Sequence, residues 1–499
     1  MTTWNFYGRA EPLAELHRIV SAGRWYFCRI QGRRRIGKTA LLGQLAKMDG
    51  LGSRLVYMQV PDSDERDVAA TFARSLGESE HEELRLLASG VTDFASMAGA
   101  IGTLCDSGTV VVLDEFQYFT RAKLRPFNSF LQAQVDRLRN AGLRHGGLFV
   151  LGSLQSDMNA LLDDKAAPLY GRLTAQLQLD HWDFEDLMSV FRDQGIEGPQ
   201  QWLTLWTFFE GVPKFYHDAF ETDLFSVHAA DFSRELLTRM FLRGSSPLSE
   251  EADTWFLREL HGRAVSILHY LADHAGCSNG DLVAALNDPN DKTPMGTYIG
   301  RLVKEYRMVD KLQAVFSDGI SRNARYYLAD NFLQAWLAVA KPAREAARLR
   351  PMAKALDSAL QRLQSLEGFA FEKLMRSLHV EMSRKGLGDF ELSEMKLGYW
   401  NRPRDATRSI ELDLVALDEP NKRIRFGSCK RSAGAHDNDA LEKFDRHVAG
   451  FLAAREHKHL STWNQEKILF SPEFTSQQRS TLVSRGYACR DLTDYARLV

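Results

Sequence analysis

The stretch of sequence that decides the fold is Gly32-Arg33-Arg34-Arg35-Ile36-Gly37-Lys38-Thr39. Glycines frame this loop because backbone N–H groups must turn inward to meet phosphate oxygens. In a loop of this pattern Lys38 reaches the β- and γ-phosphates of a nucleotide, and the hydroxyl of Thr39 holds Mg²⁺. The eight residues therefore predict a site for ATP and Mg²⁺. A basic glycine turn without a ligand is the alternative.

The segments around the loop have the character of an α/β sheet. An apolar run over residues 25–30 leads into the loop, and a helix predicted over 38–48 leaves it, so that the helix N-terminus adds its dipole to an anion site. Further strand-like runs lie at 54–60, 109–113 and 147–152, with helical stretches between them. This alternation predicts a P-loop NTPase fold, in which a parallel sheet carries the nucleotide loop.

Two carboxylates follow the apolar run over 109–113. Asp114 stands at the strand end, where it is placed to hold the Mg²⁺ shell, and Glu115 comes next, to orient or deprotonate the attacking water. In isolation an Asp-Glu pair merely ends a strand, but together with the glycine loop it predicts hydrolysis. Ser153 ends the next strand, where its side chain can touch the γ-phosphate or the water.

Two further features have open interpretations. Arg172 either supplies positive charge to the transferring phosphoryl group, within one chain or across a subunit boundary, or is a surface arginine in an ion pair. The run Gly211-Val212-Pro213 either approaches the nucleotide or forms an ordinary turn between helices.

Composition narrows the class of protein. With 499 residues, 44% hydrophobic and 26% charged, the chain suits about three globular domains. No apolar run approaches the ~20 residues that cross a bilayer, and the first residues lack a secretion signal, so we expect no membrane partner. The five cysteines are scattered and form no CxxC pair, which indicates neither a zinc site nor a disulfide framework. We therefore expect a cytoplasmic protein.

The predicted organisation has three parts. Residues 1–220 form the P-loop ATPase domain, 221–345 a helical lid with a winged-helix domain, and 346–499 a linker helix with a second α/β domain. The winged helix is predicted from three helical stretches followed by two strands around the turn Ser317–Ile320. The linker helix contains Pro351, where it is expected to break or kink.

These motifs together resemble the prokaryotic archaeal-type ATPases, members of the STAND/AAA-like class related to origin-recognition ATPases. The resemblance rests on motifs spread along the chain: Phe6–Glu11, Gly32–Thr39, Asp114–Gln117, Gly152-Ser153, Gly211–Pro213, and Arg325–Leu333 with Trp336. It implies an ATP-driven switch coupled to an effector, with Gly8 and Arg9 near the adenine side. Because many members carry a C-terminal restriction-endonuclease-like, PD-(D/E)xK, domain, it also implies such a domain at 366–499.

The C-terminal domain departs from the nuclease pattern at one position. Such nucleases collect a divalent metal with an acid on a helix, an Asp on a strand and (Asp/Glu)-x-Lys on the next strand. Glu372, Asp413 and Lys430 match this pattern, but Ser428 replaces the expected acid. A hydroxyl is a poor substitute for a carboxylate in a hard-cation site.

Three interpretations of this C-terminal site follow. The nuclease is inactive and its fold is kept for binding, a neighbouring acid such as Glu411 or Glu442 restores the metal site, or the match is fortuitous. The winged helix is equally open, because Arg301, Lys304 and Arg307 suit DNA whereas the acids beside them dilute the positive face.

Charge adds weak support for DNA. Residues 341–499 contain 28 Lys and Arg against 22 Asp and Glu, a net charge of +6, whereas the rest of the chain has a net charge of −8. The sequence thus predicts an ATP-hydrolysing switch or motor acting on DNA, with possible self-association through the ATPase domain. The alternative is an ATP-regulated signalling or scaffold protein that acts through a protein partner and cuts no nucleic acid.

Overall fold

The computed structural model describes residues 3–48, 54–79, 81–153, 155–255, 257, 260, 262–288, 291, 293–314, 316, 324–396, 398–401 and 409–499. The turn predicted at 317–320 lies outside these residues. The chain forms two compact units. The N-terminal unit consists of residues 5–182 and 212–214, and the C-terminal unit of 3–4, 183–211 and 215–499. No helix among the described residues is long and apolar enough to cross a membrane.

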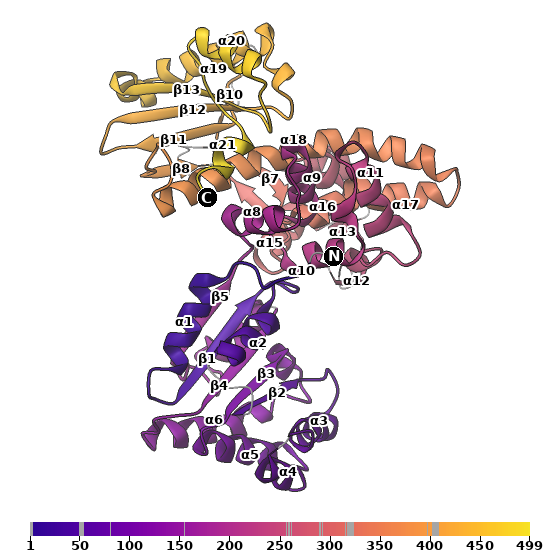
Figure 1. The fold of residues 1–499 in the computed structure, drawn as a ribbon, viewed down its shortest axis with the longest axis vertical. Helices are drawn as coiled ribbons and strands as arrows, with labels where there is room; N and C mark the ends of the chain where they lie inside the picture. Colours follow the sequence, from indigo (N-terminus) through magenta and orange to yellow (C-terminus); the bar gives the residue numbers. More distant parts are fainter. Residues whose placement is uncertain are drawn as a thin grey trace. The chain divides into compact units, whose positions relative to one another are not determined.

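The N-terminal unit is built on a five-stranded sheet in the order β2-β3-β4-β1-β5 (Figure 1). Every neighbouring pair of strands is parallel. The strands are β1 (Tyr26–Gly32), β2 (Leu55–Gln59), β3 (Val110–Asp114), β4 (Gly147–Gly152) and β5 (Ala175–Leu179). The parallel sheet expected from the sequence is therefore present, with β1 between β4 and β5. In sheets of this kind ligands bind beyond the carboxyl ends of the strands.

Two apolar cores cover the two faces of this sheet, because successive side chains of a strand point to opposite faces. Phe27 and Val111 belong to one core, and their neighbours Cys28 and Val112 belong to the other. The helices of the unit are α1 (Ala10–Val20), α2 (Lys38–Met48), α3 (Glu65–Gly77), α4 (Glu82–Ala88), α5 (Phe94–Asp106), the 3₁₀ helix η2 (Phe116–Thr120), α6 (Phe127–Asn140) and α7 (Gln155–Leu162). Both faces being covered explains why β3 reads as an uninterrupted apolar run.

The C-terminal unit begins with helices. These are α8 (Phe184–Asp193), α9 (Pro199–Phe209), α10 (Pro213–Glu221), α11 (Phe232–Leu237), a π-helical turn η5 (Thr238–Leu242) and α12 (Glu251–Trp255). Three helices and an antiparallel hairpin then follow in the winged-helix order: α13 (Arg263–Asp273), α14 (Asn279–Leu286), α15 (Met295–Lys304), β6 (Val309–Leu312) and β7 (Arg325–Leu328). The next elements are α16 (Asn331–Ala335), the π-helical turn η7 (Trp336–Ala340) and α17 (Lys341–Ala347).

A 34-residue helix, α18 (Met352–Lys385), leads into the last sheet. Pro351 precedes its first residue and separates it from α17, so the linker is broken where proline was expected to break it. The sheet has the order β14-β13-β12-β11-β8 and contains β8 (Glu394–Lys396), β11 (Leu414–Asp418), β12 (Arg423–Cys429), β13 (Asn464–Phe470) and β14 (Ala488–Arg490). β9 (Tyr399–Trp400) pairs with β10 (Glu411–Leu412), and the helices are α19 (Asn438–Ala453), α20 (Ser476–Ser484) and α21 (Leu492–Ala496).

Side chains that follow β6 pack into the core of the last sheet. Ala314 belongs to that core, and Leu312 and Phe316 pack against it, with the Phe316 ring 5.0 Å from that of His457. Compactness therefore does not separate residues 221–345 from 346–499. The domain boundaries predicted at 220 and 345 stay predictions.

Candidate functional site

The glycine loop lies at the carboxyl end of β1, in the middle of the sheet. Two glycines of the loop are required by its geometry. A Cβ atom on Gly32 would lie 2.5 Å from the carbonyl oxygen of Leu179 on the neighbouring strand, and Gly37 has a φ of +92°. Ile36 is fully buried in the core formed with α1 and α2 and thereby anchors the loop to the unit. The side chains of Arg33, Arg34 and Arg35 are half-buried.

Lys38 begins α2 and folds back over its own loop. Its Nζ donates hydrogen bonds to the carbonyl oxygens of Gly32 at 2.8 Å and Arg33 at 3.3 Å. The side chain is buried, and burial lowers the pKa of the ammonium group, although the nearby charges of Asp114 and Glu115 act in the opposite sense. A phosphate oxygen would offer this buried cation a charged partner in place of neutral carbonyls.

Asp114 collects two hydroxyl groups at the end of β3. Its Oδ2 accepts hydrogen bonds from Thr39 Oγ1 at 3.0 Å and from the Tyr57 hydroxyl at 2.7 Å. The pKa of Tyr57 is raised by burial and by Asp114, which keeps the phenol a donor. Thr39 and Asp114 together provide the hard oxygen ligands that Mg²⁺ prefers, so these residues fit the expected ion. Sequence reasoning missed Tyr57, whose only signal is its place on the adjacent parallel strand.

Glu115 and Ser153 are joined by a residue that the motif analysis did not assign. Glu115 has a left-handed backbone, with φ 56° and ψ 35°, and its N–H donates to Asp114 Oδ1 at 2.8 Å. Gln117 donates from its Nε2 to Oε2 of Glu115 and, at 3.4 Å, to Oγ of Ser153. The amide group of Gln117 thereby links the Glu115 carboxylate to the Ser153 hydroxyl.

Two distant segments meet the loop. Arg9 is buried, and its Nη2 donates to the carbonyl oxygen of Ile36 at 3.0 Å; both Arg9 and Gly8 have left-handed backbones. From a segment about 180 residues further along the chain, the N–H of Lys214 donates to the carbonyl oxygen of Arg35 at 3.4 Å. The Gly8-Arg9 segment and residues 212–214 therefore both lie against the loop, and their predicted proximity to the nucleotide stays a prediction.

Arg172 is not brought to the loop of its own chain. It precedes β5, and Thr174 bonds to Phe27 near the start of β1, so Arg172 lies toward the amino ends of strands whose carboxyl ends carry the loop. Its guanidinium forms a two-point ion pair with Asp136, at 2.8 and 2.9 Å. That pair is the surface alternative stated above. Arg172 can therefore meet a phosphoryl group only on another chain.

The C-terminal acids come from a helix and from the start of a strand. Glu372 lies on α18, and Asp413 lies between β10 and β11. Arg376, one turn after Glu372, donates to Glu372 Oε2 at 3.3 Å and to the carbonyl oxygen of Asp413 at 2.9 Å. The structure thus brings the two acids together around Arg376. Sequence reasoning missed this arginine, although its i+4 spacing from Glu372 is a readable signal.

Lys430 and Ser428 lie at the end of β12. The charge of Lys430 lowers the pKa of Asp413 and of Glu372, while burial is the largest effect and raises both. The result is a pKa of about 8 for Glu372, with the Asp413 charge as the second cause of the rise. Asp413 Oδ2 accepts the Cys429 N–H at 2.8 Å. At neutral pH this pair of acids therefore retains a proton in the absence of a cation.

The position of the missing acid, Ser428, is buried. Leu414 pairs with Gly427, so continuing the antiparallel register by one residue places Asp413 opposite Ser428. Of the two acids considered as substitutes, Glu442 is exposed on α19. Glu411 lies near the pair, because its charge raises the pKa of both Glu372 and Asp413, but it is engaged by Arg325 at 2.6 Å. That ion pair would have to open for Glu411 to act as a third carboxylate.

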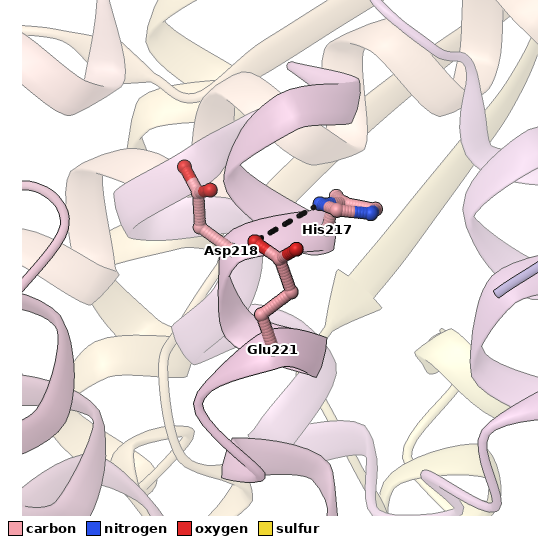
Figure 2. A group of neighbouring side chains, drawn as sticks. All are labelled: His217, Asp218 and Glu221. Atoms are coloured by element: carbon pink, nitrogen blue, oxygen red, sulfur yellow. Dashed lines mark ion pairs between the residues drawn. The ribbon is translucent and has the colours of Figure 1, made fainter. Parts of the chain in front are cut away.

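One other cluster has metal-ligand chemistry. Among the described residues, His217, Asp218 and Glu221 form the one group of three His, Cys, Asp or Glu whose ligand atoms lie within 4.8 Å of one another. All three come from α10, and His217 Nδ1 pairs with Glu221 Oε2 at 3.4 Å (Figure 2). A histidine and a glutamate four residues apart on a helix surface commonly form such an ion pair without a metal.

Comparisons with known proteins place these sites in context. Residues 336–442 match the family DUF234, described as archaea bacterial proteins of unknown function. An uncharacterized protein of Methanocaldococcus jannaschii is 22% identical over 436 residues, which is 85% of this chain and 87% of that protein.

Solved structures with a similar course of the chain include two archaeal proteins. The Walker-type ATPase of Pyrococcus abyssi is 16% identical, with a TM-score of 0.48 over 67% of this chain and 96% of that one. The ORC2 protein of Aeropyrum pernix, solved as ADPNP–ADP complexes, is 14% identical, with a TM-score of 0.46 over 73% and 96%. Function is therefore inferred below from the residues of this chain.

Proposed function

We propose that this protein binds and hydrolyses ATP with Mg²⁺ and uses the cycle to control a C-terminal unit that contacts DNA. The observation that carries the first part is the hydrogen bond from Thr39 to Asp114, because it joins the end of the glycine loop to the strand-end acid around one cation position. Lys38 and the backbone N–H groups of the loop bind the phosphates, and Thr39 and Asp114 hold Mg²⁺, which neutralises the phosphate charge when bound.

Glu115 is the proposed general base of hydrolysis. Losing a positioned base typically slows a reaction by ~10²-fold or more. We expect Glu115→Gln to bind a fluorescent ATP analogue with unchanged affinity and to turn over ATP at least ~100-fold more slowly than the wild type. An exposed acid on the same unit, Glu78→Gln, is the control. Wild-type turnover in Glu115→Gln would show that this residue is structural.

A buried ion pair supports coupling between the nucleotide loop and α18. Glu210 is buried and pairs with Lys373 Nζ at 2.8 Å, and Lys373 directly follows Glu372. Two residues after Glu210 the chain enters the N-terminal unit, where Lys214 bonds to the loop at Arg35. A shift of the loop on nucleotide binding would therefore act through the three residues between Lys214 and Glu210, and Glu210 is anchored to α18.

A second buried pair connects α18 to the segment that follows β12 and contains Lys430. Glu367, which is 1% exposed, accepts Arg431 Nε at 2.6 Å and the Thr204 hydroxyl at 2.7 Å. Thr204 belongs to α9, the helix that leads to Glu210. Helices α9 and α18 are thus joined at two points. Lys373 at one point directly follows Glu372, and Arg431 at the other directly follows Lys430.

For the C-terminal site we infer DNA binding without efficient cleavage. Two acids with Lys430 and Arg376 suit a phosphate backbone better than a divalent ion, because a third carboxylate is replaced by Ser428. The mildly basic charge of residues 341–499 agrees with this inference. We further propose a cytoplasmic protein that self-associates through its N-terminal unit, which Arg172 requires if it is to act on a neighbouring chain.

DNA binding and its coupling to ATP are tested together. We expect the affinity for a fluorescent duplex to differ between the ATP and ADP states and to fall steeply with added salt. We also expect bound DNA to stimulate ATP turnover. Lys373→Met should keep the ATPase activity but abolish the difference between nucleotide states, whereas Lys354→Met, at an exposed position of α18, should keep both. If duplex and single-stranded DNA leave turnover unchanged and bind too weakly to measure, a signalling or scaffold protein with a protein partner is the better description.

A further inference from the structure

The side chain of Gln117 is held rigidly between Glu115 and Ser153. Gln117 is 2% exposed and lies in η2, between Phe116 and Phe119, both fully buried in the core of the N-terminal unit. Its own carbonyl oxygen accepts the Thr120 hydroxyl at 2.7 Å. A buried amide on a fixed backbone has few alternative rotamers, so its two polar atoms have defined positions.

The residue that follows β4, Ser153, determines which way the amide of Gln117 points. Gln117 Oε1 accepts the backbone N–H of Ser153 at 3.4 Å, which leaves Nε2 as the atom that faces Glu115. Gly152 makes room for this arrangement, because a Cβ atom there would lie 3.0 Å from Gln117 Oε1 and 2.3 Å from Met158 Sδ. The amide can therefore only donate to the Glu115 carboxylate.

We propose that Gln117 is a positioning residue for hydrolysis: it holds Oε2 of Glu115 so that Oε1 faces the attacking water, and it ties this acid to Ser153. The inference rests on the ATPase function proposed above. In the reaction, the water oxygen forms a bond to the γ-phosphorus while the bond to the β,γ-bridging oxygen breaks, with its electron pair leaving on ADP. One water proton passes to Oε1 of Glu115. A carboxylate with one oxygen fixed presents the other in a defined direction.

The link to Ser153 gives this arrangement a second consequence. β4 is the parallel neighbour of β1, and Gly152 pairs with Gln31 at the start of the glycine loop. Ser153 therefore lies at the sheet edge where the phosphates bind, and a phosphate that engages its hydroxyl acts on the amide that holds the base. Gln117 makes the orientation of Glu115 depend on the presence of a γ-phosphate.

Gln117→Met tests the proposal, because methionine has a similar length and lacks both polar atoms. We expect kcat for ATP to fall ~10- to 100-fold with KM changed less than about threefold, since an interaction used only in the transition state affects kcat. In the Glu115→Gln background the same substitution should cause less than a twofold further loss. Gln134→Met, at a half-buried glutamine of α6, is the matched control and should behave as wild type.

Two results would overturn the role of Gln117 while leaving the ATPase function intact. These are unchanged kcat in Gln117→Met, or an equal loss in the Glu115→Gln background. A wild-type protein without ATP turnover would instead refute the proposed function itself. If Gln117→Met fails to fold, Gln117→Asn keeps a polar amide that is one methylene too short to reach Glu115, and the same loss of kcat without a change in KM is expected.

Discussion

The two acid sites of this protein differ in what surrounds the carboxylate. Asp114 accepts two hydroxyl hydrogen bonds, from Thr39 and Tyr57, and lies beside a lysine held by its own loop. Asp413 instead has a second acid as its neighbour, with Arg376 contacting both. Burial and the neighbouring acid raise the pKa of Glu372, and burial raises that of Asp413, so this pair retains a proton in the absence of a cation. The difference supports the proposal that the first site binds Mg²⁺, whereas the second, where Ser428 replaces an acid, binds a divalent ion poorly.

The largest effect is expected at the first site. Lys38→Ala should abolish ATP binding or hydrolysis, because Lys38 is the buried cation that compensates phosphate charge. Equilibrium binding of an ATP analogue and steady-state turnover measure this loss. Lys47→Ala, in the last turn of the same helix, should leave both unchanged. Undiminished ATP affinity and turnover in Lys38→Ala would show that the glycine loop is not the nucleotide site, and the proposed difference between the two acid sites would fall with it.

A second prediction concerns Arg172, which lies away from the glycine loop of its own chain. Losing an arginine that stabilises phosphoryl transfer typically costs ~10³-fold in turnover. Arg172→Ala should lower turnover of the self-associated protein to this extent without changing ATP affinity. Mixing Arg172→Ala with Lys38→Ala chains should restore part of the activity, because each supplies what the other lacks. The exposed control Arg139→Ala should leave turnover unchanged. Unchanged turnover in Arg172→Ala as well would show that Arg172 serves only in the ion pair with Asp136.

Adding the missing acid should make the second site resemble the first. Ser428→Glu introduces a third carboxylate near Asp413, and we expect Mn²⁺ affinity to rise ~10-fold or more, because carboxylate count tunes such sites. Calorimetric titration measures the affinity, and a plasmid assay with Mg²⁺ or Mn²⁺ measures cleavage, which Asp413→Ala should remove again. Ser432→Glu, in the exposed loop after β12, is the control. Robust cleavage by the wild type that depends on Asp413 would show that another acid completes the site.

The smallest expected effect is a loss of stability at low pH, which comes from histidines of the C-terminal unit. His379 and His436 are buried in the C-terminal unit, and burial lowers the pKa of each to about 4. The unfolded chain, with an ordinary histidine pKa of ~6.5, takes up protons first, so stability falls as the pH drops from about 6.5 towards 4.

Each histidine should then cost about 2 kcal/mol of unfolding free energy between pH 7 and pH 5. Urea unfolding of the full chain at the two pH values measures this cost. Replacing both histidines by glutamine should flatten the dependence, even if stability at pH 7 is lower. An unchanged pH dependence in the double variant would assign the acid sensitivity to other groups.

The sequence predicted the parts of the fold that depend on local pattern. β3 was expected over 109–113 and is found at Val110–Asp114, because a strand covered on both faces is apolar throughout. The glycine loop is a contiguous motif and needs no knowledge of topology. β5, with its alternating sequence Ala-Gln-Leu-Gln-Leu, was not predicted, since it lies at the sheet edge and is only half-buried.

The residues that escaped sequence reasoning owe their roles to strand order and helix packing. Tyr57 contacts the nucleotide site from an adjacent strand, and no motif spacing links it to the site. Gln117 belongs to the motif Asp114–Gln117, but the motif alone gave its side chain no role. The placement of Arg172 depends on the direction of β5, which was missing from the predicted sheet. Glu372, Asp413 and Lys430 were named from a resemblance, and Arg376 became visible only when the helix met the strand.

The chain passes between its two compact units at four places: after residue 4, after 182, after 211 and after 214. Three residues thus belong to the N-terminal unit although about thirty residues of the other unit precede them. A fragment ending at residue 182 would lose the hydrogen bond from Lys214 to Arg35 and the proline beside Gly37. The two units are therefore not interchangeable modules. Recombination between relatives at a single crossover after residue 182 would separate the glycine loop from residues 212–214, so we expect the units to have been inherited together.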